Sequence, residues 1–126
     1  MIQMLMVGLG GFFGAISRYW LGGWVQRRFG EGFPLGTLTV NLVGCFLIGL
    51  AMHLALNKEW VSPNLRFLVV VGFLGSLTTF STFGYDTLHL LEKGAWRQCL
   101  ASVLANVLVG LIAVVLGRLV GRWITS

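Results

Sequence analysis

The chain has few charged residues. Only 10% of its 126 residues are Asp, Glu, Lys or Arg, whereas 56% are hydrophobic, and the mean hydropathy is +0.85. Soluble domains carry about 25% charged residues. This composition excludes a soluble globular domain and indicates an integral membrane protein.

Cysteine and histidine are equally scarce. The two cysteines, Cys45 and Cys99, lie inside apolar runs, and His53 and His89 are the two histidines. These positions suggest neither a disulfide framework nor a cluster of metal ligands. The sequence also shows no pairing of a nucleophile with a general base of the kind that covalent catalysis requires. We therefore expect that the protein is not an enzyme.

Acidic residues are fewer than basic ones, with four Asp and Glu against nine Lys and Arg. A basic protein often binds nucleic acid. Here the basic residues lie singly or in pairs at the ends of hydrophobic segments, where Lys and Arg anchor helices to lipid headgroups. We therefore expect a lipid bilayer as a partner and no nucleic acid.

The hydrophobic segments are long enough to cross a bilayer, which takes about 20 mostly apolar residues in a helix. The four segments cover roughly residues 2–24, 35–56, 65–91 and 96–120. Short connections separate them, and Pro34 and Pro63 precede the second and third, as prolines do at helix starts. This pattern predicts an all-α membrane protein with four transmembrane helices in one domain, residues 1–126. The first segment lacks a basic n-region and contains Arg18, so we do not expect a signal peptide.

The third segment has a polar stretch at its centre. Residues 72–83 have the sequence GFLGSLTTFSTF, which contains two glycines and five hydroxyl side chains. Glycine and hydroxyl residues disfavour the helix interior, and the segment is longer than one crossing requires. We predict a helix broken near residues 75–79 into two half-helices. The alternative is a continuous helix whose glycines allow close packing.

The basic residues at the segment ends give no preferred orientation. One side of the membrane would hold Lys58, Arg66, Arg118 and Arg122, and the other Arg27, Arg28, Lys93 and Arg97. Cytoplasmic loops normally carry an excess of Lys and Arg, and here neither side has one. We therefore expect insertion in both orientations and an antiparallel, dual-topology homodimer. The alternative is a single orientation set by another cue.

So short a chain would leave polar side chains facing lipid unless a partner covered them. A second copy would provide this cover. Two faces of small residues would let its helices approach closely, namely Gly8, Gly11 and Ala15, and Gly110, Gly117 and Gly121.

Other polar residues lie at membrane depth. Asn41 follows Thr37 by one helical turn, while Ser102 and Asn106 share one face of the fourth segment with Gly110. Buried Ser and Asn side chains often form hydrogen bonds between helices. A stripe of them is also typical of an ion path, and the sequence leaves both roles open.

Two phenylalanines, Phe80 and Phe83, share a helical face beside Ser81 and Thr82. Phenylalanine in a membrane helix usually faces lipid or fills the core. However, the edge of an aromatic ring is electropositive, so two rings placed edge-on can face a small anion. Weak binding at several sites is what rapid conduction requires.

Arg18 and Asp86 are the charged residues nearest to membrane depth. Arg18 either extends to the membrane surface or binds backbone carbonyls. Asp86 either pairs with Arg18, holds a cation or lies in a wet vestibule.

Three segments resemble the Fluc (CrcB) family of fluoride channels. They are GGFFGAISRYW at residues 10–20, GTLTVNLVG at residues 36–44 and GFLGSLTTFSTF at residues 72–83. The resemblance covers essentially the whole chain, and the third motif is the most specific. It implies a passive channel for fluoride ions in the bacterial inner membrane, built as an antiparallel homodimer with two pores, which reduces fluoride toxicity.

The resemblance also implies roles for individual residues. A structural Na⁺ would lie at the dimer centre on the backbone carbonyls of Gly75 and Thr78 from both copies. The anion pathway would be lined by Asn41, Phe80, Ser81, Thr82, Phe83, Ser102 and Asn106. Asn106 departs from the family pattern, since relatives often have a hydroxyl there, and Asp86 stands near the position where relatives often have glutamate.

The alternative function is a small dual-topology exporter that exchanges protons for cations or drugs. Such a transporter needs a titratable carboxylate at membrane depth. The first segment contains Arg18 and no carboxylate, and Asp86 lies near the end of a segment. The sequence therefore favours the channel.

Overall fold

The computed structural model describes residues 1–57 and 61–126, which are almost entirely helical. The elements are α1 (Ile2–Phe29), α2 (Leu35–Asn57), α3 (Pro63–Arg66), the π-helix η1 (Phe67–Leu74), α4 (Gly75–Leu77), α5 (Phe80–Glu92), α6 (Trp96–Leu104), the π-helix η2 (Ala105–Val109) and α7 (Gly110–Thr125). Four stretches are long and apolar enough to cross a membrane: Ile2–Phe29, Leu35–Ala55, Pro63–Glu92 and Trp96–Thr125. The protein is therefore all-helical, with four candidate spans.

The first helix continues beyond residue 24, where the hydrophobic segment was expected to end. It reaches Phe29 because Arg27 and Arg28 lie in its last turn, where positive side chains stabilise the helix C-terminus. A hydropathy pattern marks the apolar part of a helix and not its charged last turn.

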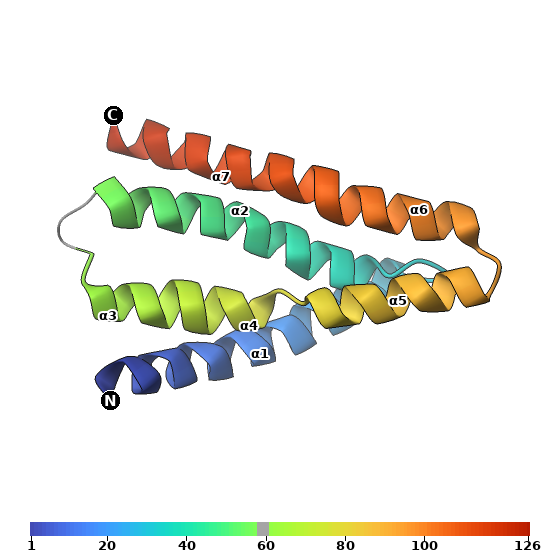
Figure 1. The fold of residues 1–126 in the computed structure, drawn as a ribbon, viewed down its shortest axis with the longest axis horizontal. Coiled ribbons are helices and arrows are strands. Elements are labelled where there is room, and N and C mark those ends of the chain that lie inside the picture. The colour runs from blue at the N-terminus through green and yellow to red at the C-terminus, as the bar shows by residue number, and fades with distance from the viewer. Residues whose placement is uncertain (58–60) are drawn as a thin grey trace.

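The four spans run in alternating directions, so both termini lie at one end of the bundle together with the start of α3 (Figure 1). The turns before α2 and before α6 lie at the other end. Of the basic residues that the charge count placed at the ends, Lys58 lies outside the described residues.

The two most extensive contacts between helices are α2 along α7 and α1 along η1. Both contacts bring backbone against backbone at glycines. A Cβ atom on Gly14 would lie 2.2 Å from the carbonyl oxygen of Phe73, and one on Gly117 would lie 1.9 Å from that of Phe46. Gly121 also faces α2, at His53. The fourth segment therefore uses Gly117 and Gly121 within the chain.

Few side chains are buried in a single chain. Among the described side chains, the buried apolar ones are Val25, Val40, Leu74, Leu77, Phe83 and Leu90. Large apolar side chains are exposed along the first, third and fourth spans, whereas α2 lies among the other helices and exposes Val43 alone among its described large apolar side chains. Such exposure is expected for a chain whose surroundings are lipid or another apolar protein surface.

The packing of α2 on α7 can be tested with two Gly→Ala changes on the same helix. Gly117→Ala should lower the free energy of unfolding by about 1–3 kcal/mol, because the added methyl group overlaps the Phe46 carbonyl. Gly110→Ala is the matched control, since its Cβ would lie 3.5 Å from the Cys45 sulfur, an ordinary contact. Thermal or denaturant unfolding in detergent measures both, and equal losses in the two variants would contradict this packing.

Candidate functional site

Two non-helical residues, Thr78 and Thr79, separate α4 from α5. Thr78 has φ −82° and ψ 158°, and Thr79 has φ −150° and ψ 114°, so both are extended. The non-helical stretch is shorter than the predicted residues 75–79, because Gly75–Leu77 stay helical. Thr79 is the N-cap of α5: its hydroxyl oxygen accepts the Thr82 N–H at 3.2 Å and its O–H donates to the Thr82 hydroxyl at 2.9 Å.

The side chain of Asn41 on α2 pairs with the main chain of Thr79. The Thr79 N–H donates to Asn41 Oδ1 at 2.8 Å, and Asn41 Nδ2 donates to the Thr79 carbonyl at 3.2 Å. Asn41 Nδ2 also donates to Asn106 Oδ1 at 2.9 Å, and Asn106 Nδ2 donates to the Ser102 carbonyl at 2.9 Å. These four bonds join α2, the non-helical residues and the fourth span in one network.

Arg18 on α1 binds the other non-helical residue. Its Nη1 donates to the Thr78 carbonyl at 3.3 Å, so of its two alternatives the structure has the bond to a backbone carbonyl. Asp86 is bonded to a different residue, because the Thr37 hydroxyl donates to Asp86 Oδ2 at 2.6 Å. No ion pair joins Asp86 to Arg18 in the described part of the chain.

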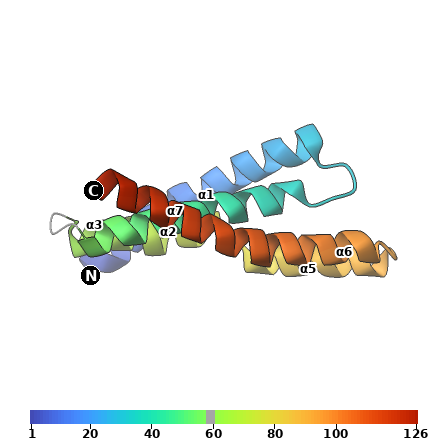
Figure 2. The same cartoon turned by 90° about the horizontal axis from the view of Figure 1, so that it is seen from above.

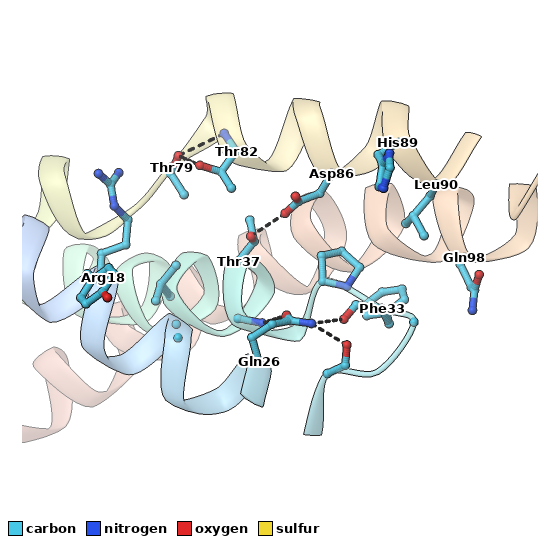
Figure 3. A pocket seen from close by; sticks show the side chains of 18 of the residues that line it. Arg18, Gln26, Phe33, Thr37, Thr79, Thr82, Asp86, His89, Leu90 and Gln98 are labelled. Carbon is cyan, nitrogen blue, oxygen red and sulfur yellow. Dashed lines mark hydrogen bonds between the residues drawn. The ribbon is translucent and has the colours of Figure 1, made fainter. Parts of the chain in front are cut away.

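A cavity of about 820 Å³ lies between the α1–α2 end and the α5–α6 hairpin. Figure 2 shows these two parts of the bundle diverging at that end. The polar side chains on its wall include Arg18, Gln26, Asp86, His89 and Gln98, and Figure 3 shows Thr37 and Asp86 joined by their hydrogen bond within it. The wall is mostly apolar, and these charged and polar groups give it places where water and ions can bind.

A second cavity of about 330 Å³ lies on the other side of the non-helical residues. Four of the predicted pathway residues line it, namely Asn41, Phe80, Phe83 and Asn106, together with the predicted sodium ligands Gly75 and Thr78. The two rings meet edge to face with centroids 5.5 Å apart. Phe83 is 9% exposed, whereas Phe80 is 83% exposed, so a single chain encloses only one of the two rings.

The remaining predicted pathway residues lie elsewhere. Thr82 lines the larger cavity, and Ser81 is exposed, with its hydroxyl 3.4 Å from that of Thr79. Ser102 is 1% exposed and lines neither cavity. Among the described residues its hydroxyl oxygen has no hydrogen-bond partner, and the same holds for Thr87.

Several residues at the site were not among the predicted site residues, and two of them lie beside the non-helical stretch or the smaller cavity. Thr79 combines the helix cap with the bonds to Asn41, and Cys45 lines the smaller cavity. The spacing of Thr79 and Thr82 was a usable signal, because an N-cap hydroxyl commonly accepts the N–H three residues later. Cys45 gave no signal, since it lies within an apolar run.

The cap on α5 can be tested by removing its hydroxyl. Thr79→Ala should lower the free energy of unfolding by about 1 kcal/mol, because the Thr82 N–H loses its acceptor. Thr79→Ser keeps the hydroxyl and should lose clearly less. Denaturant titration in detergent measures both, and a serine variant as unstable as the alanine variant would show that the methyl group, and not the cap, stabilises this position.

Comparison with known proteins identifies the family. Residues 5–118 match the family model described as CrcB-like protein, Camphor Resistance (CrcB). A relative from Geobacter metallireducens, named Fluoride-specific ion channel FluC, is 48% identical over 122 residues, covering 97% of this chain and 98% of its own. Another relative of that name, from Citrifermentans bemidjiense, is 45% identical over 122 residues, which again cover 97% of this chain and 98% of its own. Fluoride-specific ion channel FluC 1 of Methanosarcina acetivorans is 45% identical over 119 residues, or 94% of this chain and 90% of its own. The chain is a multi-pass membrane protein and belongs to the CrcB family.

Proposed function

We propose that the protein is a passive, fluoride-selective channel of the bacterial inner membrane that lets cytoplasmic fluoride leave the cell. The observation that carries this proposal is the identity of 45–48% over nearly the whole length with relatives named as fluoride-specific ion channels. The same relatives support a transporter that is not an enzyme. They give no support to the alternative of a proton-coupled exporter, and Asp86, its candidate carboxylate, is bonded to Thr37.

The proposed path passes the smaller cavity beside the break in the third span. Here the continuous stretch of α3, η1 and α4 acts as one half-helix and α5 as the other. The N-terminus of α5 lies at the cavity wall, where its partial positive charge favours an anion. The edges of Phe80 and Phe83 add weak electropositive contacts. Amide and hydroxyl donors replace the water of the hydrated ion. Such weak, multi-site binding lets the ion leave again.

The proposed channel is an antiparallel homodimer. Phe80 is 83% exposed beside a cavity that Phe83 closes from within the chain, and a second copy would cover it. The apolar outer faces provide the surface for this contact. Three of the described basic residues lie at the end of the bundle with both termini, namely Arg66, Arg118 and Arg122. Four lie at the other end, namely Arg27, Arg28, Lys93 and Arg97. This near balance favours insertion in both orientations.

The chemistry of hydrogen fluoride explains why passive export helps a cell. In acid surroundings fluoride is protonated to HF, which crosses membranes without a carrier. Inside, HF dissociates, and the charged fluoride ion cannot return through lipid. A channel that passes only the anion lets it leave down its own gradient, while protons stay where the cell's pumps maintain them.

A structural Na⁺ at the dimer centre is part of this proposal. The Gly75 and Thr78 carbonyls fit such an ion, although the Thr78 carbonyl also accepts a hydrogen bond from Arg18. In an unbroken helix the Gly75 carbonyl would accept the Thr79 N–H, but that N–H donates to Asn41. The Gly75 carbonyl is therefore available to a cation. The Thr78 carbonyl already accepts from Arg18, and its second lone pair remains for the ion. Two copies would supply four carbonyls.

Fluoride efflux from liposomes tests the function. Liposomes loaded with fluoride and containing the purified protein should release it quickly once a potassium ionophore carries the balancing charge, and they should retain chloride. Phe80→Ile and Phe83→Ile should each slow release by about tenfold or more, because the ring edges are lost, while the dimer persists. Phe12→Ile is the matched control, since Phe12 lines neither cavity.

Two results would count against these assignments. Liposomes that hold fluoride as tightly as protein-free ones would refute the channel. Normal release from both Phe80→Ile and Phe83→Ile would be consistent with the channel but would show that the two rings serve only in packing.

Sodium removal tests the proposed cation and the dimer together. Purification in N-methylglucamine salts should lower the midpoint of thermal unfolding and favour monomers, because repulsion between inward-facing carbonyls is no longer balanced by an ion. Added Na⁺ should restore the midpoint with a saturable dependence on concentration, while an equal ionic strength of N-methylglucamine should not. Identical midpoints and dimer fractions in both salts would rule out the sodium site.

A further inference from the structure

We propose that Gly44 on α2 is a positioning residue for the break in the third span. Because Gly44 has no side chain, the methyl group of Thr78 packs directly against its backbone, and this contact determines where the Thr78 carbonyl lies. The inference rests on the proposed function, because that carbonyl is one of the proposed sodium ligands. The contact itself is part of the fold and can be measured without any ion.

The contact at Gly44 leaves no room for a side chain. A Cβ atom on Gly44 would lie 2.1 Å from Thr78 Cγ2 and 3.6 Å from Thr78 Cβ. Carbon atoms that are not bonded to each other are most stable about 3.5–4.0 Å apart. Among the described residues of the other helices and the break, Thr78 alone comes within 4 Å of that added atom. A side chain at residue 44 would therefore act on Thr78 and on no other residue of the break.

A hydrogen bond keeps the Thr78 methyl group in this position. Thr78 Oγ1 donates to the Leu74 carbonyl at 3.1 Å, and the Thr78 N–H donates to the same carbonyl at 3.2 Å. The hydroxyl and the methyl group share one carbon atom, and threonine has few favourable rotamers. Turning the methyl group away from Gly44 would thus turn the hydroxyl away from Leu74. A methyl group added at residue 44 must either break this bond or displace the main chain of Thr78.

The Thr78 carbonyl depends on this contact because the helical hydrogen bonds do not hold it. In an unbroken helix it would accept the Thr82 N–H, but that N–H donates to the Thr79 hydroxyl. Its partner among the described residues is Arg18, at 3.3 Å, whose long side chain has many rotamers and can follow a displaced acceptor. The carbonyl therefore lies where the main chain of Thr78 places it.

Gly49 provides a matched control on the same helix. A Cβ atom on Gly49 would lie 2.1 Å from the Val114 carbonyl oxygen, so a methyl group there is equally crowded, but against the fourth span. Gly49 lines neither cavity. Gly44→Ala and Gly49→Ala should both lower the midpoint of thermal unfolding by several degrees, because overpacking is destabilising. Only Gly44→Ala should alter the break.

Sodium binding and fluoride efflux distinguish the two variants. In Gly44→Ala the Na⁺ concentration that gives half of the sodium-dependent rise in midpoint should increase by about tenfold or more, because a displaced carbonyl binds the ion less well. Efflux from liposomes should slow by about tenfold or more, because Thr78 leads directly into α5 and its cavity-lining rings. In Gly49→Ala both values should stay within about twofold of wild type.

Removing the opposing methyl group tests the contact directly. Thr78→Ser deletes Cγ2 and keeps the hydroxyl that donates to Leu74. Combined with Gly44→Ala, it should bring the midpoint, the Na⁺ dependence and the efflux to within about twofold of Thr78→Ser alone. The same serine change should not improve Gly49→Ala. Because the double variant still carries the methyl group at residue 44, restored efflux also shows that this group does not block the path.

Two results would overturn the inference. One is a double variant that remains as impaired as Gly44→Ala, and the other is a Gly44→Ala protein with wild-type Na⁺ dependence and efflux. If Gly44→Ala does not fold, the double variant still decides, because it should fold. A wild-type midpoint that does not respond to Na⁺ would refute the sodium site, and efflux from the variants would then decide the role of Gly44. Wild-type liposomes that release no fluoride would refute the channel instead, and the sodium titrations would decide that role.

Discussion

Backbone groups at membrane depth must find partners within the protein, and the site depends on how this chain satisfies that constraint at two residues. The Thr78 N–H donates to the Leu74 carbonyl, and the Thr78 carbonyl accepts from Arg18. Both main-chain groups of Thr79 pair with Asn41. All four polar main-chain groups therefore have partners, which come from three spans. An interruption of this kind is stable only when side chains replace the helical hydrogen bonds.

The two extended residues lie where the two cavities described above meet. The larger one lies beside Arg18 and Asp86, and the smaller one beside Phe80 and Asn106. Thr79 lines both, so the cavities meet at the residue that Asn41 holds. Any ion that moves from one to the other passes this point. The interactions that satisfy the backbone are thus the same ones that shape the proposed path.

The sequence predicted the helices well, because each span is a local property of about 20 apolar residues, and the structure has four such spans. The run of hydroxyls in residues 72–83 also indicated where polar chemistry lies. It did not indicate that Asn41 would bind Thr79, 38 positions away, or that Thr37 would bind Asp86, 49 positions away. Those pairs depend on how the helices are rotated and staggered against one another. Glycines determine this packing because they let two backbones approach closely, and a hydropathy pattern does not show which glycines do so.

Asn106 shows what an amide adds to such a network compared with a hydroxyl. A hydroxyl at this position has a single O–H, so it could accept from Asn41 and donate once. An amide accepts through its oxygen and donates twice. Here Asn106 accepts from Asn41 and donates to the Ser102 carbonyl, and its second N–H has no partner among the described residues. The side chain can therefore bond both Asn41 and the Ser102 carbonyl and still offer a donor to a further partner. A hydroxyl that donates to the backbone has no donor left.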